Sequence, residues 1–184
     1  WRGRVLLPLL AVLAGCGEPQ SSSLERIRDE GRLVVLTRNA PTVYYVDRDG
    51  RPAGPEFELA SAFGGHLGVE VELRVLASVA AMLEALRRGK GDLVAAGLTR
   101  TDARRDEFRF GPTYQRVSQQ VVCRRDGPAP ESVEELAGVA LTVGSDTSYE
   151  ERLVRLQAEY PGVEWHSVDR PTELLLEAVW EGED

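Results

Sequence analysis

Short apolar runs alternate with amphipathic segments through most of the chain, which is the pattern of a parallel α/β protein. In the first half, apolar or alternating runs predict strands over 32–37, 69–76 and 93–96. Apolar residues at helical spacing predict helices over 24–30, 56–67 and 78–88. Strands and helices therefore take turns along the chain, as parallel strand pairing requires.

The helix over 56–67 is expected to turn Phe57, Ala60, Phe63 and Leu67 toward the core, because this spacing places them on one face. Two consecutive glycines lie within the same segment and weaken it as an isolated helix. Before it, the letters DRDG predict a tight hairpin turn.

The same alternation starts again after a turn rich in Gly and Pro at 126–130. It predicts a short helix after a capping box at Ser132–Glu135, a strand over 139–143, a helix from a second capping box at Ser148–Glu151 to Tyr160, a strand over 163–168 and a helix over 172–180. The last residues, 182–184, are typical of the start of a further strand. We therefore expect a second α/β unit that is unfinished, in a chain that is a fragment of a longer protein.

The stretch that joins the two units contains the strongest candidates for ligand-binding residues. Its strand runs into Gly97, followed by Thr99, Thr101 and Arg104, and a second apolar run predicts a strand over 117–122. A glycine lets a ligand approach the backbone, a threonine donates a hydroxyl hydrogen bond, and an arginine binds a carboxylate through two bonds. The alternative is an ordinary strand-to-helix turn, in which Thr101 is the N-cap and Arg104 lies on a solvated helix face.

Composition excludes several classes of function. The chain has 184 residues, 42% hydrophobic and 28% charged, which is typical of a globular protein, and its net charge of −8 argues against a nucleic-acid partner. The cysteines, Cys16 and Cys123, lie in different contexts, so we expect no structural disulfide, and Cys123 is expected to be a buried thiol. His66 and His166 lack partners at ligand spacing, so we predict neither a metal site nor a cofactor.

The first residues have the build of a secretory signal. Arg2 and Arg4 precede a short apolar run, Val5–Leu13, and small residues lead to Cys16. The letters LAGC resemble a bacterial lipobox, which implies cleavage after a signal peptide at 1–15 and a lipid on Cys16. Such a protein is anchored to a membrane without spanning it. The alternative interpretation is a shortened buried helix.

Four segments together resemble a known family: LERIRDEGRLVVLT, GPEFELASAFGGHLGVEVEL, RRGKGDLVAAGLTRTDARRDEFRFGPTY and LAGVALTV. In this order they resemble solute-binding proteins of family 3, the periplasmic receptors for polar amino acids. Within that group, AAGL followed by FGPTYQRVSQQVVCR is most similar to the N-terminal domain of the membrane-bound lytic murein transglycosylase F family. The resemblance covers nearly all of residues 24–184.

The resemblance implies an α/β, periplasmic-binding-protein-like fold of two lobes with parallel-rich sheets and a ligand in the cleft between them. A lipidated cysteine, a tether and a short helix would occupy 16–30. Lobe 1 would cover 31–118, a hinge strand 119–124, and the incomplete lobe 2 125–184.

The resemblance also implies roles for particular residues. Gly97, Thr99 and Arg104 match the part of lobe 1 that holds an α-carboxylate. The matches elsewhere are Thr147 and Ser148 as an anion contact at a helix N-terminus, Tyr44 or Tyr45 as an aromatic cover, and Asp184 as the acid for the α-amino group. The lobe 2 loop reads GSDTS, which departs from the usual glycine-then-threonine form. The tyrosines could instead be packing residues, and Ser148 could be only an N-cap.

No catalytic residue is expected within the chain. A lytic transglycosylase needs a general acid/base glutamate, and the only Glu-Ser pair, Glu131-Ser132, lies in a linker without the Ala- and Gly-rich run that follows the family's catalytic pair. Three hypotheses follow. The preferred one is a periplasmic, lipid-anchored ligand-binding domain of an outer-membrane murein transglycosylase, binding an amino acid or muropeptide, with a catalytic domain beyond Asp184. The others are a receptor that delivers amino acids to an ABC permease and a periplasmic dehydratase on the same fold.

Overall fold

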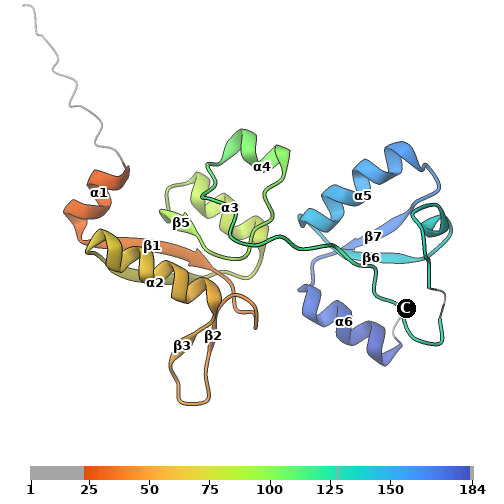
Figure 1. The fold of residues 1–184 in the computed structure, drawn as a ribbon, viewed down its shortest axis with the longest axis horizontal. Coiled ribbons are helices and arrows are strands. Elements are labelled where there is room, and N and C mark those ends of the chain that lie inside the picture. Colours follow the sequence, from red (N-terminus) through yellow and green to blue (C-terminus); the bar gives the residue numbers. More distant parts are fainter. Residues whose placement is uncertain (1–22, 128, 183–184) are drawn as a thin grey trace, which may run out of the picture.

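A computed structural model describes residues 23–127 and 129–182, which form two α/β lobes joined by an extended segment (Figure 1). Lobe 1 contains α1 (Ser23–Glu30), β1 (Arg32–Thr37), β2 (Tyr45–Val46), β3 (Pro52–Ala53), α2 (Pro55–Leu67), β4 (Glu70–Val75), α3 (Val79–Arg87), β5 (Leu93–Val94) and α4 (Asp102–Glu107). Lobe 2 contains the 3-10 helix η1 (Glu134–Leu136), β6 (Leu141–Gly144), α5 (Ser148–Glu159), β7 (Trp165–Val168) and α6 (Thr172–Glu181). The predicted α/β class is confirmed.

The sheet of lobe 1 is parallel, in the order β4-β1-β5. The central strand β1 is buried at every residue after Arg32, because strands pair with it on both sides and helices cover both faces. This explains why its sequence, RLVVLT, is a continuous apolar run rather than an alternating one. Strand β4 lies at the edge of the sheet, so its sequence, EVELRV, keeps polar residues.

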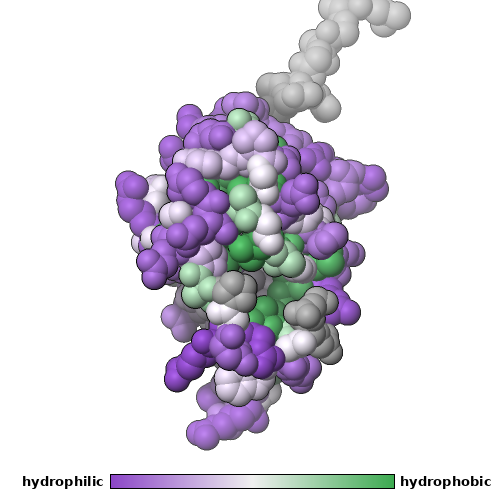
Figure 2. Space-filling view, turned by 90° about the vertical axis from the view of Figure 1, so that its right-hand side faces the viewer, coloured by the Kyte–Doolittle hydropathy of each residue, from purple (hydrophilic) through white to green (hydrophobic). Residues whose placement is uncertain are grey.

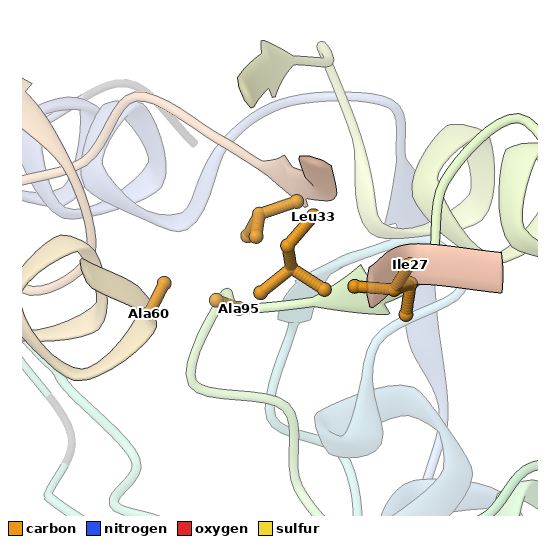
Figure 3. Packing of buried hydrophobic residues seen from close by; sticks show 5 residues of the cluster. Ile27, Leu33, Ala60 and Ala95 are labelled. Carbon is orange, nitrogen blue, oxygen red and sulfur yellow. The ribbon is translucent and has the colours of Figure 1, made fainter. Parts of the chain in front are cut away.

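Each face of this sheet has its own apolar cluster. One consists of Ile27, Leu33, Val35, Ala60 and Ala95, which brings α1, β1, α2 and the residue after β5 together (Figure 3). The cluster on the other side consists of Leu36, Ala40, Val43, Met82 and Ala96. Consecutive residues of β1 therefore anchor opposite layers, as the two-residue period of a strand requires.

Helix α2 buries Ala60 as predicted, and Leu67 packs against the cluster around Leu33, but the prediction for Phe63 is wrong. Its buried residues are Glu56, Ala60 and Gly64, whereas Phe63 is 44% exposed. The reason is close packing: a Cβ built on Gly64 would lie 2.3 Å from a methyl carbon of Val71. A stripe of small residues lets α2 approach β4 closely, and this packing outweighs the burial of Phe63.

Lobe 2 is a smaller unit. Strands β6 and β7 pair in parallel, and Leu136, Leu141 and Val163 form its core. Helix α6 contacts β6, yet Trp180 on α6 is 87% exposed. Seen from the lobe 2 end of the molecule, apolar surface gathers near the middle and is bordered by hydrophilic residues (Figure 2).

The connecting segment corrects the prediction of a strand over 117–122. Residues 109–124 take no regular secondary structure, and Val117, Val121 and Val122 are exposed. A strand needs a neighbour to complete its backbone hydrogen bonds, and no strand of the described residues pairs with this segment. Cys123, expected to be buried, is a free and exposed thiol for the same reason. The lobe boundaries at 118 and 124 stay predictions.

The predicted signal peptide, Cys16 and Asp184 lie outside the described residues. Across 23–127 and 129–182, no helix combines the length and hydropathy needed to cross a bilayer. The same residues contain no cluster of three or more His, Cys, Asp or Glu side chains placed to hold a metal ion.

Candidate ligand site between the lobes

The loop after β5 positions the lobe 1 side of the site. Gly97 has a positive φ of 60°, a left-handed conformation that costs a residue with a side chain roughly 1–2 kcal/mol. Thr101 then ends the loop as the N-cap of α4, with its hydroxyl accepting a hydrogen bond from the Arg104 amide at 3.4 Å. The glycine turn and the cap together set where the first turn of α4, and Arg104 on it, lies.

Arg104 is buried at the junction of the two lobes. It is only 6% exposed, so the alternative of a solvated helix face is wrong, although Thr101 caps α4 as that alternative required. Its guanidinium donates to the backbone carbonyls of Thr99 at 3.3 Å and Asp146 at 3.1 Å. Nη2 also pairs with Glu151 Oε1 at 3.1 Å. The Asp146 and Glu151 partners belong to lobe 2, so Arg104 joins the lobes.

The N-terminus of α5 forms the opposite side. Thr147, rather than Ser148, is the N-cap, because its hydroxyl accepts from the Glu150 amide at 3.4 Å. Ser148 is the first residue of the helix and is buried, and its hydroxyl donates to the Thr99 hydroxyl at 3.0 Å. The alternative that Ser148 is only an N-cap is therefore wrong, since it contacts the predicted lobe 1 site directly.

The capping box of α5 is shifted by one residue from the predicted Ser148–Glu151. Both TSYE and SYEE fit the motif, and the structure uses the former. Glu150 reaches back to the Asp146 amide at 2.8 Å and also accepts a hydrogen bond from the Ser167 hydroxyl. The hydrogen bond from the Ser167 hydroxyl and, to a smaller extent, the bond from the Asp146 amide hold the pKa of Glu150 below its usual value. Because Glu150 takes the capping role, Glu151 is available to pair with Arg104.

The connecting segment also reaches this junction. The Gln119 side-chain amide donates to the Ser148 carbonyl at 3.3 Å and to its hydroxyl at 3.4 Å. At a second point, Arg38 after β1 pairs with Glu173 of α6 at 3.4 Å. Both lobes and the segment between them thus meet around the residues that the sequence singled out.

A buried acid beside the glycine turn was missed by the sequence prediction. Glu56 is 7% exposed, and its Oε1 would lie 3.8 Å from a Cβ built on Gly97. The carboxylate accepts a hydrogen bond from the Tyr114 hydroxyl. Partial desolvation of its hydroxyl, and then the hydrogen bond to the Glu56 carboxylate, raise the pKa of Tyr114, although 62% of the residue as a whole is exposed. The sequence did contain a signal for this burial. Glu56, Ala60 and Gly64 are spaced four residues apart, which places Glu56 on the face of α2 that packs against the sheet.

The two candidate tyrosines have different surroundings. Tyr44 is half-buried, packs against the cluster around Leu36 and meets Phe57 edge to face with 6.3 Å between ring centroids. This contact agrees with the packing alternative for Tyr44. Tyr45 begins strand β2 and is exposed.

A cavity of about 360 Å³ lies beside the Arg104–Glu151 pair. Its walls come from α3, α4 and α5, so both lobes contribute to it. Arg87 and Phe108 also line it, and the Arg87 guanidinium lies 5.4 Å from the centroid of the Phe108 ring. Ala80, Leu83 and Val154 give the cavity an apolar part. Space is therefore present next to the charged junction.

A family model for the bacterial extracellular solute-binding proteins, family 3, matches residues 32–179, which covers both lobes. The chain belongs to this family. Among solved structures, an ancestral arginine-binding protein bound to arginine is 27% identical with a TM-score of 0.71, over 83% of this chain and 66% of that one. An ancestral amino acid-binding protein, a precursor of cyclohexadienyl dehydratase, is 25% identical with a TM-score of 0.76, over 88% of this chain and 72% of that one. The predicted two-lobe receptor fold is thereby confirmed.

Longer relatives carry the name membrane-bound lytic murein transglycosylase F. One from Alkalilimnicola ehrlichii is 40% identical over 99% of this chain, and one from Maricaulis maris is 38% identical over 100%. The chain spans 41% and 42% of these relatives' lengths. The predicted resemblance to this group is confirmed for the solute-binding part.

Proposed function

We propose that this family 3 domain binds an amino acid or a muropeptide between its lobes and serves as the non-catalytic receptor half of a lipid-anchored lytic murein transglycosylase. One observation carries the proposal: a buried arginine, Arg104, lies where both lobes and their connecting segment converge. Burying a guanidinium is costly unless anionic or carbonyl partners surround it. Here the carbonyls of Thr99 and Asp146 and the Glu151 carboxylate offset the cost. A guanidinium held in this way where two lobes meet is placed to bind a ligand carboxylate.

The proposed binding surface combines both lobes. Arg104 and the Thr99 hydroxyl hold the ligand carboxylate from lobe 1, at the turn that Gly97 makes possible. Ser148 and the first amides of α5 face it from lobe 2, where a helix N-terminus favours negative charge. Ligand binding then closes the lobes by a hinge motion at the connecting segment.

Calorimetry with the full chain tests the site. The titrants are the twenty L-amino acids and a muropeptide that ends in a free carboxylate, each compared with its carboxyl amide. Binding of a carboxylate with loss of binding by the matched amide supports the assignment. Equal binding of acid and amide, or binding unaffected by Arg104→Ala, would refute it.

The parent enzyme is a separate part of the proposal. The transglycosylase relatives support a catalytic domain in the same polypeptide, as does their length relative to this chain. Sequencing the gene past the codon for Asp184 tests this directly. We expect a lysozyme-like domain with a Glu-Ser pair on a helix, and the purified parent should release soluble fragments from peptidoglycan sacculi.

A second candidate function is an amino-acid receptor for an ABC permease. The similarity to an arginine-bound solute receptor favours it. The same gene sequence distinguishes the two, because a stop codon soon after the receptor domain excludes a catalytic domain. Free amino acids would then be the first titrants, and muropeptides would not bind.

The lipid anchor on Cys16 and the outer-membrane location complete the proposal. In cells expressing the parent gene, labelled palmitate should enter the protein, and Cys16→Ala should abolish this incorporation. Membrane fractionation then assigns the location. Failure of the label to enter would remove the anchor from the proposal without affecting the ligand site.

A further inference from the structure

We propose that Glu151 is a built-in competitor for the ligand carboxylate, occupying Arg104 until a ligand displaces it. This inference rests on the proposed function of Arg104 as the carboxylate receptor. Glu151 thereby becomes a specificity-determining residue, because only a ligand that pairs with Arg104 better than Glu151 does opens the site. The family resemblance assigned no role to Glu151.

The hydrogen bonds of Arg104 carry the argument. One terminal nitrogen, Nη1, donates to the Thr99 carbonyl, while Nη2 donates to the Asp146 carbonyl and pairs with Glu151. A carboxylate that binds an arginine through two bonds needs two neighbouring N–H groups. Both common two-bond arrangements, through Nη1 with Nη2 or through Nε with Nη2, use an N–H group of Nη2. The Asp146 carbonyl and the Glu151 carboxylate lie against Nη2, which has two N–H groups, so a ligand carboxylate must exchange with one of them.

Glu151 is the acceptor best suited to exchange. The carbonyls of Thr99 and Asp146 are fixed by the backbone, whereas Glu151 is a side chain that is partly exposed on α5. Capping does not hold it, because Glu150 fills that role one residue earlier. The adjoining cavity of about 360 Å³, which Glu151 lines, gives its carboxylate room to rotate away.

Two consequences follow from this placement. Without a ligand, the Arg104–Glu151 pair links α4 to α5, so it holds the two lobes near each other. With a ligand, the attraction of Arg104 for the incoming carboxylate is offset by the loss of Glu151. Weakly binding anions are therefore rejected.

The first readout needs no ligand. In a Cys16→Ser, Cys123→Ser background, spin labels attached through Arg88→Cys, at the C-cap of α3, and Trp180→Cys, on α6, report the distance between the lobes. We expect Glu151→Gln to lengthen or broaden this distance in the full chain. Glu159→Gln, which removes the same charge at the far end of α5, should leave it unchanged. An unaltered distance in Glu151→Gln would overturn the claim that the Arg104–Glu151 pair holds the two lobes near each other.

The second readout is affinity. Calorimetry with the twenty L-amino acids and their carboxyl amides should show Glu151→Gln binding the acids about tenfold more tightly than the wild type, with the amides unaffected. Equal or weaker binding of the acids by Glu151→Gln would overturn the competition. If neither protein binds an amino acid but the distance changes, the proposed amino-acid ligand fails while the occupancy of Arg104 by Glu151 stands.

Discussion

The Ser148 hydroxyl on α5 donates a hydrogen bond to the Thr99 hydroxyl after β5, at 3.0 Å and across 49 residues of sequence. This contact joins the lobes at a position where both residues were expected to face a ligand. Two hydroxyls that meet across a cleft can each turn toward a bound anion instead, because a hydroxyl both donates and accepts. The junction is thus suited to exchanging internal bonds for ligand bonds.

Substitutions at Thr147 and Ser148 should separate capping from ligand contact. Thr147→Ala removes the N-cap of α5 and should lower the free energy of unfolding by about 1 kcal/mol. Ser148→Ala keeps the cap, so it should cost less stability but weaken ligand binding, by about 1 kcal/mol for a lost hydrogen bond. Urea unfolding and calorimetry check the pair. If Thr147→Ala and Ser148→Ala lost equal stability and neither affected binding, Ser148 would have a capping role only.

Arg104→Ala should abolish or strongly weaken ligand binding. Truncation of a buried charge partner typically costs about 2–5 kcal/mol of binding free energy. Arg105→Ala is the matched control, because Arg105 is exposed on the same helix and pairs with Asp102 within it. Calorimetry on both variants checks the prediction. A similar affinity for the Arg104 and Arg105 variants would contradict the assigned site.

The neighbouring glycines of α2 should respond in opposite directions to alanine. At Gly64 a Cβ would lie 2.3 Å from Val71, so Gly64→Ala should destabilise the protein by about 1–3 kcal/mol through overpacking. At Gly65 a Cβ meets nothing within 4 Å, and Gly65→Ala should stabilise by about 0.5–1 kcal/mol through improved helix propensity. Denaturant unfolding measures both. Loss of stability in both variants would contradict a packing in which Gly64 faces β4 and Gly65 faces open space.

Stability at alkaline pH should depend on Tyr114. Its raised pKa means that the folded protein keeps the phenol neutral after the unfolded chain ionises it. The resulting stability is present below the tyrosine's usual pKa of about 10 and is lost as pH rises through the raised value. Tyr114→Phe should therefore lose stability less steeply above pH 10 than the wild type. At neutral pH it should cost about 1 kcal/mol, because Glu56 loses a donor.

Tyr149→Phe serves as the control for this measurement. Tyr149 lies on α5, and within 23–127 and 129–182 its hydroxyl makes no hydrogen bond to a carboxylate, unlike that of Tyr114, so Tyr149→Phe should preserve the alkaline profile of the wild type. Thermal unfolding followed at pH 7, 9, 10 and 11 records the three profiles. A parallel decline of wild type and Tyr114→Phe would show that the pKa of Tyr114 is not raised in the folded protein.

The order of elements in the chain was predictable because it depends on local pattern. The apolar run at 32–37 marked the central strand, and the spacing around Met82 marked α3 and its buried residue. Thr101 was recognisable as a cap, since capping is satisfied within one turn. The grouping of Thr99 and Arg104 followed from their short separation.

Contacts across the lobes were decided only by tertiary structure. The motif TSYEE permits two capping boxes, and which acid caps α5 depends on Ser167 and on Arg104, both distant in sequence. Likewise, Phe63 is exposed, against expectation, and Gly64 is buried, because α2 packs closely on β4. The run at 117–122 has strand propensity, but a strand requires a partner along its length.

The sequence by itself determined the α/β class and the arginine-bearing turn, because periodicity, caps and glycine turns act over a few residues. Its resemblance to known proteins, and not these local patterns, indicated the family. Tertiary structure alone decided that Arg104 is buried, that Glu151 pairs with it and that Ser148 meets Thr99. These outcomes depend on how two lobes pack, and packing energy is shared by residues far apart in the chain.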